Sequence, residues 1–168
     1  ADLALVVLNL RRKDFDEALQ AIAALEKKLP NNPVTHNLRA VALLGKGDRI
    51  NARVAFRQAL GIDPTFHAAA INLARMDMED NKPEDARRVF EAVLAKDRTN
   101  LQAMLALADL ARVSNQTKTY LDWLERASKA HPTSIPPRAA LVRHHLSRKE
   151  PQKALAIAKA AVTAMPDN

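Results

Sequence analysis

The feature that most constrains this chain is a repeat of 34 residues. Proline occurs at positions 30, 64, 132 and 166, and Arg98 occupies the remaining place in that series. Five copies fill the 168 residues without an insertion, and the first copy lacks only its first two positions. A repeat of this length is one supersecondary unit, which stacks on copies of itself to bury its apolar side chains. The sequence therefore predicts a stacked array without a long-range core.

Each copy is expected to contain two helices. In the third copy, Ala70, Leu73 and Ala74 recur at the helical spacing i, i+3 and i+4. Residues 81–83 interrupt this pattern, and Pro83 suits the first turn of a second helix. The chain has 32 alanines, 3 glycines and only 4% aromatic residues, a composition that favours helices and leaves little material for hairpin turns. We therefore predict an all-α fold and exclude a β-sandwich or barrel.

Small residues at repeat positions 8 and 20 allow the two helices of each copy to approach closely. Together with a large apolar residue at position 24 and proline at position 32, they make the pattern resemble the tetratricopeptide repeat over the whole chain. The resemblance implies a right-handed α-solenoid of ten antiparallel helices. It is a single array with units at 1–32, 33–66, 67–100, 101–134 and 135–168. Two departures are Arg39 at position 7 and Tyr120 at position 20, and the polar turn at 114–118 predicts the least secure hairpin.

A finer resemblance concerns residues 72–97. This stretch is similar to the repeat lipoproteins of bacterial PEP-CTERM/exosortase systems, which accompany exopolysaccharide loci and carry an N-terminal lipid anchor. The resemblance implies that the chain is an internal fragment of a longer envelope protein. It also implies a location in the bacterial periplasm, anchored to the outer membrane.

The residues needed for catalysis or metal binding do not form a recognisable set. There is no cysteine, and His144 and His145 are adjacent, so on a helix they point about 100° apart. No glycine-rich phosphate loop or hydrolase motif occurs. The apolar run Leu3–Leu8 is far shorter than the roughly 20 residues of a membrane span. We therefore expect no enzymatic activity, no cofactor, no metal and no membrane-spanning helix.

The tetratricopeptide resemblance implies a binding surface on the first helix of each unit, at repeat positions 2, 5, 9 and 12. We call this surface the groove face, because in the family it lines a concave groove that holds peptides. Its three arginines are expected to lack permanent partners within the chain, so that a carboxylate or sulfate can bind them. The groove face comprises Asn37, Val41, Leu44, Ile71, Arg75, Met78, Gln102, Leu105, Asp109, Arg112, Ala139 and Arg143.

The groove face predicts a non-enzymatic protein–protein interaction scaffold that binds a peptide or helix. The PEP-CTERM resemblance implies a partner from an envelope polysaccharide-export or protein-sorting system. The net charge of +7 supports an alternative, direct binding of an acidic polysaccharide by the basic surface. Nucleic acid is not expected, because Tyr120 and Trp123 stand alone and form no stacking platform. Apolar residues on the first and last helices predict end-to-end self-association.

Overall fold

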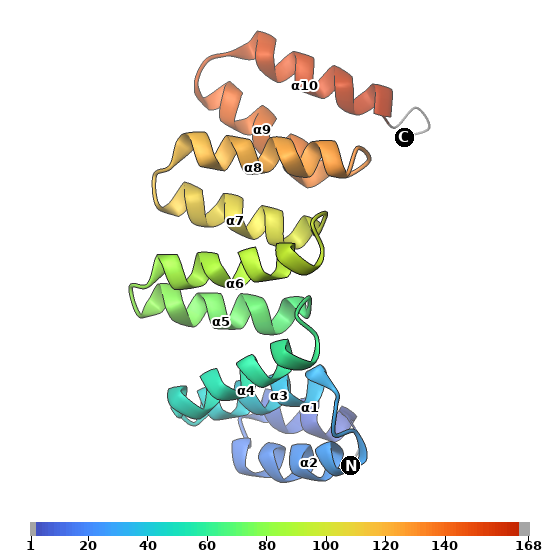
Figure 1. The fold of residues 1–168 in the computed structure, drawn as a ribbon, viewed down its shortest axis with the longest axis vertical. Coiled ribbons are helices and arrows are strands. Elements are labelled where there is room, and N and C mark those ends of the chain that lie inside the picture. Colours follow the sequence, from blue (N-terminus) through green and yellow to red (C-terminus); the bar gives the residue numbers. More distant parts are fainter. Residues whose placement is uncertain (1–2, 165–168) are drawn as a thin grey trace. The chain divides into compact units, whose positions relative to one another are not determined.

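The structure is a computed structural model that describes residues 3–164, all of whose regular elements are helices (Figure 1). The predicted all-α repeat fold is confirmed. Helices follow one another in pairs joined by short turns, and Pro33, Pro83 and Pro151 each occupy the first position of a helix, as proline's fixed φ favours. The helices are α1 (Leu3–Arg12), α2 (Phe15–Lys28), α3 (Pro33–Gly45), α4 (Arg49–Ile62), α5 (His67–Glu79), α6 (Pro83–Lys96), α7 (Leu101–Val113), α8 (Thr117–Ala130), α9 (Ile135–Ser147) and α10 (Pro151–Ala164).

The chain divides into two compact units, and the boundary in the sequence falls within α6, between Ala92 and Val93. In the first unit, α3, α4 and α5 share a core in which Phe56 is fully buried among alanines. Ala40, Ala55 and Ala59 are each at most 2% exposed, and their single methyl groups let the helices pack closely around the ring. A second cluster joins α1, α2 and α3 around Val6 and Ile22.

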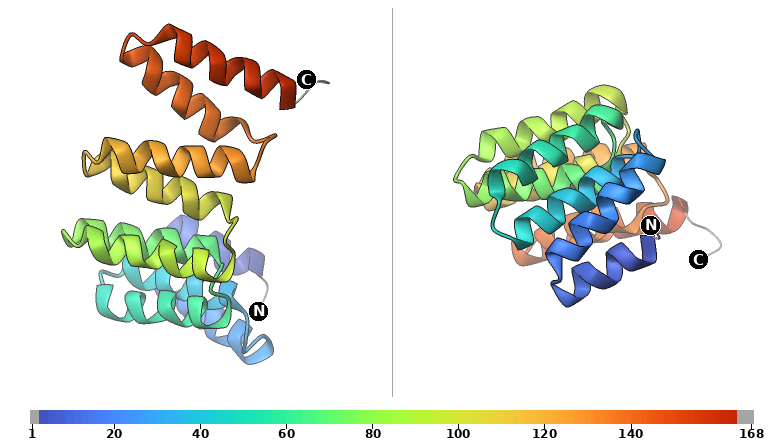
Figure 2. Two further views of the ribbon diagram at one scale, coloured as in Figure 1. Left: turned by 45° about the horizontal axis from the view of Figure 1, so that its top comes forward. Right: turned by 90° about the horizontal axis from the view of Figure 1, so that it is seen from below.

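The second unit has its own core, made by α7, α8 and α9. Ala108, Leu124 and Leu141 lie at its centre, and Tyr120 and Ile157 pack against them. Figure 2 shows α7 and α8 as an antiparallel pair, the yellow and orange helices of the left view. This core places the first helices α7 and α9 on either side of α8, the arrangement on which the candidate site depends.

One backbone conformation recurs in the turn inside every helix pair. The residue at repeat position 15 has positive φ in all five copies, with values between 56° and 82°. The next amide donates a hydrogen bond of 2.8–2.9 Å to the carbonyl five residues earlier, which closes the Schellman motif at the end of the first helix. The polar turn at 114–118 has the same closure, and whether its hairpin is the least secure stays a prediction. The five residues are Lys13, Gly47, Asn81, Asn115 and Lys149.

Two charged side chains that depart from the apolar pattern are paired with charges on the neighbouring helix pair. Arg39 Nε donates a 3.0 Å hydrogen bond to Glu26 Oε1, which links α3 to α2. Asp77 of α5 has a side chain only 4% exposed, and its carboxylate accepts a hydrogen bond from Arg53 of α4. Such pairing is what makes charge tolerable at a buried position. Both pairs join consecutive helix pairs of the first unit.

Candidate functional site

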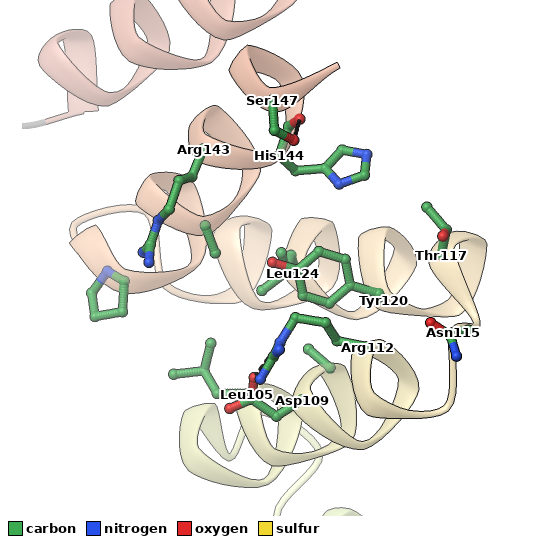
Figure 3. Close-up of a pocket in the computed structure, with 13 residues that line it drawn as sticks. Leu105, Asp109, Arg112, Asn115, Thr117, Tyr120, Leu124, Arg143, His144 and Ser147 are labelled. Atoms are coloured by element: carbon green, nitrogen blue, oxygen red, sulfur yellow. Dashed lines mark hydrogen bonds and ion pairs between the residues drawn. The ribbon is translucent and has the colours of Figure 1, made fainter.

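A pocket of about 870 Å³ lies in the second unit. α7, α8 and α9 all contribute to its lining, and the groove-face side chains of α7 and α9 face one another across it (Figure 3). Four predicted groove-face residues line it together: Leu105, Asp109 and Arg112 from α7, and Arg143 from α9. Of the other groove-face residues in this unit, Gln102 is exposed and Ala139 is half-buried, and neither lines the pocket.

The two arginines of this pocket differ in their partners. Arg112 Nε donates a hydrogen bond of 3.2 Å to Asp109 Oδ1, one helical turn away. The expectation that Arg112 has no partner within the chain is therefore wrong, because i,i+3 residues on a helix are neighbours. Arg143 is exposed and makes no hydrogen bond or ion pair with the residues that the structure describes. Arg143 is thus the pocket's unneutralised cation.

An aromatic pair forms the back of the pocket. The Tyr120 ring lies edge-on to the ring of His144, with 6.0 Å between their centres, and this contact joins α8 to α9. Position 20 is alanine in the other four copies, where Ala18, Ala52 and Ala86 are fully buried and Ala154 is 3% exposed. A tyrosine cannot occupy the volume of a methyl group, so its ring extends into the space between the first helices. The sequence flagged Tyr120 as a departure but did not assign it to a binding surface.

The groove face of the first unit is largely engaged within the chain. Val41 and Leu44 are half-buried against the core around Phe56. Asn37 and Met78 are also half-buried, and Ile71 is 41% exposed. Arg75 is exposed, yet it donates a 3.2 Å hydrogen bond to Asn72 Oδ1, and Asn72 in turn contacts Asn37 across α5 and α3 at 3.4 Å. The prediction that Arg75 has no partner is therefore also wrong.

A polar contact beside the pocket fixes the end of α9. His145 Nδ1 lies 2.7 Å from Glu150 Oε2, and Lys153 Nζ lies 3.2 Å from the same oxygen. The hydrogen bonds from His145 and then Lys153 lower the pKa of Glu150 below its ordinary value. This pairing holds the C-terminal end of α9, which carries His144, against the start of α10.

Many arginines on the second helices are neutralised by neighbouring carboxylates. Arg49 contacts Glu79 at 2.9 Å and Asp80 at 2.8 Å, and these hydrogen bonds raise the pKa of Arg49. Arg87 contacts Glu84 at 2.6 Å, and Arg88 pairs with Asp85. These pairs cancel charge locally on the second helices, and the net charge of +7 already counts their carboxylates.

Neither a metal centre nor a membrane span is apparent in the part of the chain that the structure describes. Within residues 3–164, no three histidine, aspartate or glutamate side chains gather as metal ligands would. No helix in that range has both the length and the apolar character that crossing a bilayer requires.

Comparison with known proteins identifies the repeat. A family model described as tetratricopeptide repeat matches residues 43–110, from the end of α3 to the last turn of α7. The tetratricopeptide-repeat resemblance is confirmed. No curated protein sequence matches the chain.

Solved tetratricopeptide-type structures resemble the whole chain. MamA from Desulfovibrio magneticus RS-1, from residue 41 to its end, is 19% identical with a TM-score of 0.63, covering 98% of this chain and 93% of that one. PilW, a widely conserved type IV pilus biogenesis factor, is 21% identical with a TM-score of 0.61, covering 100% and 80%. YrrB, a TPR protein with an unusual peptide-binding site, is 12% identical with a TM-score of 0.56, covering 97% and 84%. At these identities the likeness shows the shared fold alone.

Proposed function

We propose that this chain is a non-enzymatic interaction scaffold that binds a peptide or helix of a partner protein on its groove face. The observation that carries the proposal is the 870 Å³ pocket, because it gathers groove-face side chains from two separate helices. Leu105 and the Tyr120 ring, both half-buried, offer apolar contact there, while Arg143 and Asn115 offer hydrogen-bond donors. A peptide, which combines apolar side chains with polar backbone groups, matches this mixed lining.

The setting we propose is a bacterial envelope system for polysaccharide export or protein sorting. Support comes from the similarity of residues 72–97 to the repeat lipoproteins of PEP-CTERM systems. In this proposal the chain is part of a longer lipid-anchored protein and acts in the periplasm at the outer membrane. One of the structurally similar proteins, PilW, is itself described as a pilus biogenesis factor.

The alternative is direct binding of an acidic polysaccharide, and the net charge of +7 is the observation in its favour. The ion pairs of Arg49, Arg53, Arg87 and Arg88 do not remove this excess positive charge, because the net charge already subtracts their carboxylate partners. The mixed apolar and polar lining of the pocket is the observation that supports the peptide instead.

Affinity capture from the native host, followed by quantitative binding of the captured partner, tests the proposal. The wild-type chain is compared with an Arg143→Glu variant at low and high salt. Groove binding over an apolar lining is expected to persist at high salt, where the Debye length falls to about 3 Å, and to weaken in the variant. Polysaccharide binding that is lost at high salt and is equally strong in the wild type and in Arg143→Glu would favour the alternative. Enzymatic turnover of the captured partner would contradict the non-enzymatic assignment.

The predicted end-to-end self-association stays a prediction. Its structural basis is the outer surface of α10, where Leu155 is 55% exposed and Val162 is 68% exposed.

A further inference from the structure

The charged groups of the α7–α9 pocket do not cancel. Asp109 and Arg112 form an ion pair with each other. Arg143 reaches the same space from α9 and makes no hydrogen bond or ion pair within residues 3–164 (Figure 3). Of the remaining polar side chains that line the pocket, none carries a fixed negative charge. The pocket as a whole therefore offers one uncompensated positive charge.

The surroundings of Arg143 limit which anion fits. The guanidinium group presents a planar fork of donors that matches a carboxylate in a bidentate geometry. Asp109 lines the same pocket, so a doubly charged phosphate would face its carboxylate, whereas a single negative charge matches the single free cation. A carboxylate is the singly charged group that a partner protein supplies most simply.

The apolar lining indicates what flanks that carboxylate. Leu105 and the Tyr120 ring, both half-buried, provide the apolar surface of the pocket. The other four copies have alanine at the position of Tyr120. Displacement of water from these surfaces favours an apolar residue next to the carboxylate of the peptide. It also strengthens the pairing between that carboxylate and Arg143. This apolar surface is specific to the pair of α7 and α8, because the repeat pattern has alanine where the fourth copy has Tyr120.

We propose that the pocket between α7 and α9 is a subsite for an aspartate or glutamate side chain of the partner peptide, bound by Arg143 and flanked by an apolar residue that packs on Tyr120. This inference rests on the proposed function and specifies which partner segment the groove face selects.

A peptide titration tests the inference. The probes are the blocked peptides acetyl-Gly-Leu-Glu-Leu-Gly-amide and its counterpart with glutamine in the central position. Each is titrated into the ¹⁵N-labelled full chain, and amide chemical shifts are followed by NMR. We expect shifts in α7, α8 and α9, and an affinity for the glutamate peptide about tenfold higher than for the glutamine peptide, as the loss of a charge-assisted hydrogen bond implies.

Two variants of Arg143 and one matched arginine variant supply the controls. Arg143→Gln is expected to make the two peptides bind equally, and Arg143→Lys to restore part of the difference because it retains the charge without the fork. Arg57→Gln changes an exposed arginine on the second helix α4, outside the groove face, and is expected to leave both affinities unchanged. The dispersion of the NMR spectrum shows that each variant is folded.

The outcomes separate this inference from the proposed function. Equal binding of the two peptides by the wild type, or an unchanged preference in Arg143→Gln, overturns the acidic subsite while groove binding stands. Absence of shifts at millimolar peptide also overturns it. Failure of the native partner to contact the groove face, in contrast, overturns the proposed function itself.

Discussion

The pairing of Arg53 with Asp77 lets the energetic cost of a buried charge be predicted. Replacing Arg53 by leucine leaves the carboxylate of Asp77, whose side chain is 4% exposed, without its partner. Removal of one member of a buried ion pair costs about 3–5 kcal/mol. Because the Arg53 side chain is itself 20% exposed, water replaces part of the lost interaction. We therefore expect Arg53→Leu to lower the free energy of unfolding by about 3 kcal/mol, at the lower end of that range.

Two matched variants make this prediction specific. Arg49→Leu removes an exposed arginine from the same helix, α4. Its partners are Glu79, the last residue of α5, and Asp80, which directly follows, and the change is expected to affect stability far less. The double variant Arg53→Leu/Asp77→Leu replaces both charges by apolar groups. It is expected to return to within about 1 kcal/mol of the wild type, since apolar packing commonly substitutes for a buried pair.

Urea unfolding followed by far-ultraviolet circular dichroism measures all three variants at neutral pH. The ordering expected is a large loss for Arg53→Leu, a small loss for Arg49→Leu and near-recovery for the double variant. The reasoning is refuted if Arg53→Leu and Arg49→Leu are equally stable, or if the double variant is as unstable as the single one.

Three further predictions follow from the turns and helix ends. Lys149→Gly should stabilise the chain by about 1 kcal/mol and Gly47→Ala should destabilise it similarly in thermal unfolding, because both positions have positive φ; equal effects of both changes would contradict this. Gly45→Ala should cost about 1–3 kcal/mol, since the new methyl group would lie 2.2 Å from the Phe15 ring, and Gly45→Ala combined with Phe15→Leu should recover part of that loss. Because the pKa of Glu150 is lowered in the folded chain, its contribution is present above the ordinary glutamate pKa and is lost as the pH falls through the lowered value. The stability difference between the wild type and Glu150→Gln should therefore shrink once the pH falls below the ordinary glutamate pKa and vanish below the lowered one. A difference that stays constant as the chain is acidified would disprove the linkage.

The helices and their pairing could be predicted from the sequence because the information is local and repeated five times. Small residues at position 8, alanine at position 20 in four copies, and the breaks near Pro83 and Pro151 recur at one spacing, so each copy supports the others. The turns with positive φ could be predicted from the sequence only in part. Gly47, Asn81 and Asn115 are residue types that tolerate positive φ, whereas Lys13 and Lys149 are not.

The pocket was less predictable because it depends on side chains from different copies. Periodicity places Arg112 and Arg143 on the groove face, but it does not show that Asp109 neutralises the first and leaves the second free. Tyr120 was visible as a departure from the repeat, yet its effect depends on where α9 places His144. The pair of Arg53 and Asp77 was hidden for the same reason, since 24 residues separate its members.

Hydrogen–deuterium exchange of the chain with and without its native partner tests the central claim most directly, because it reports which helices the partner covers. If the groove face is the binding surface, protection is expected on the first helices, and most strongly on α7 and α9 around Leu105 and Arg143. The second helix α4, which contributes nothing to the pocket lining, should exchange as in the free chain. Protection confined to the second helices, with α7 and α9 unchanged, would contradict the account.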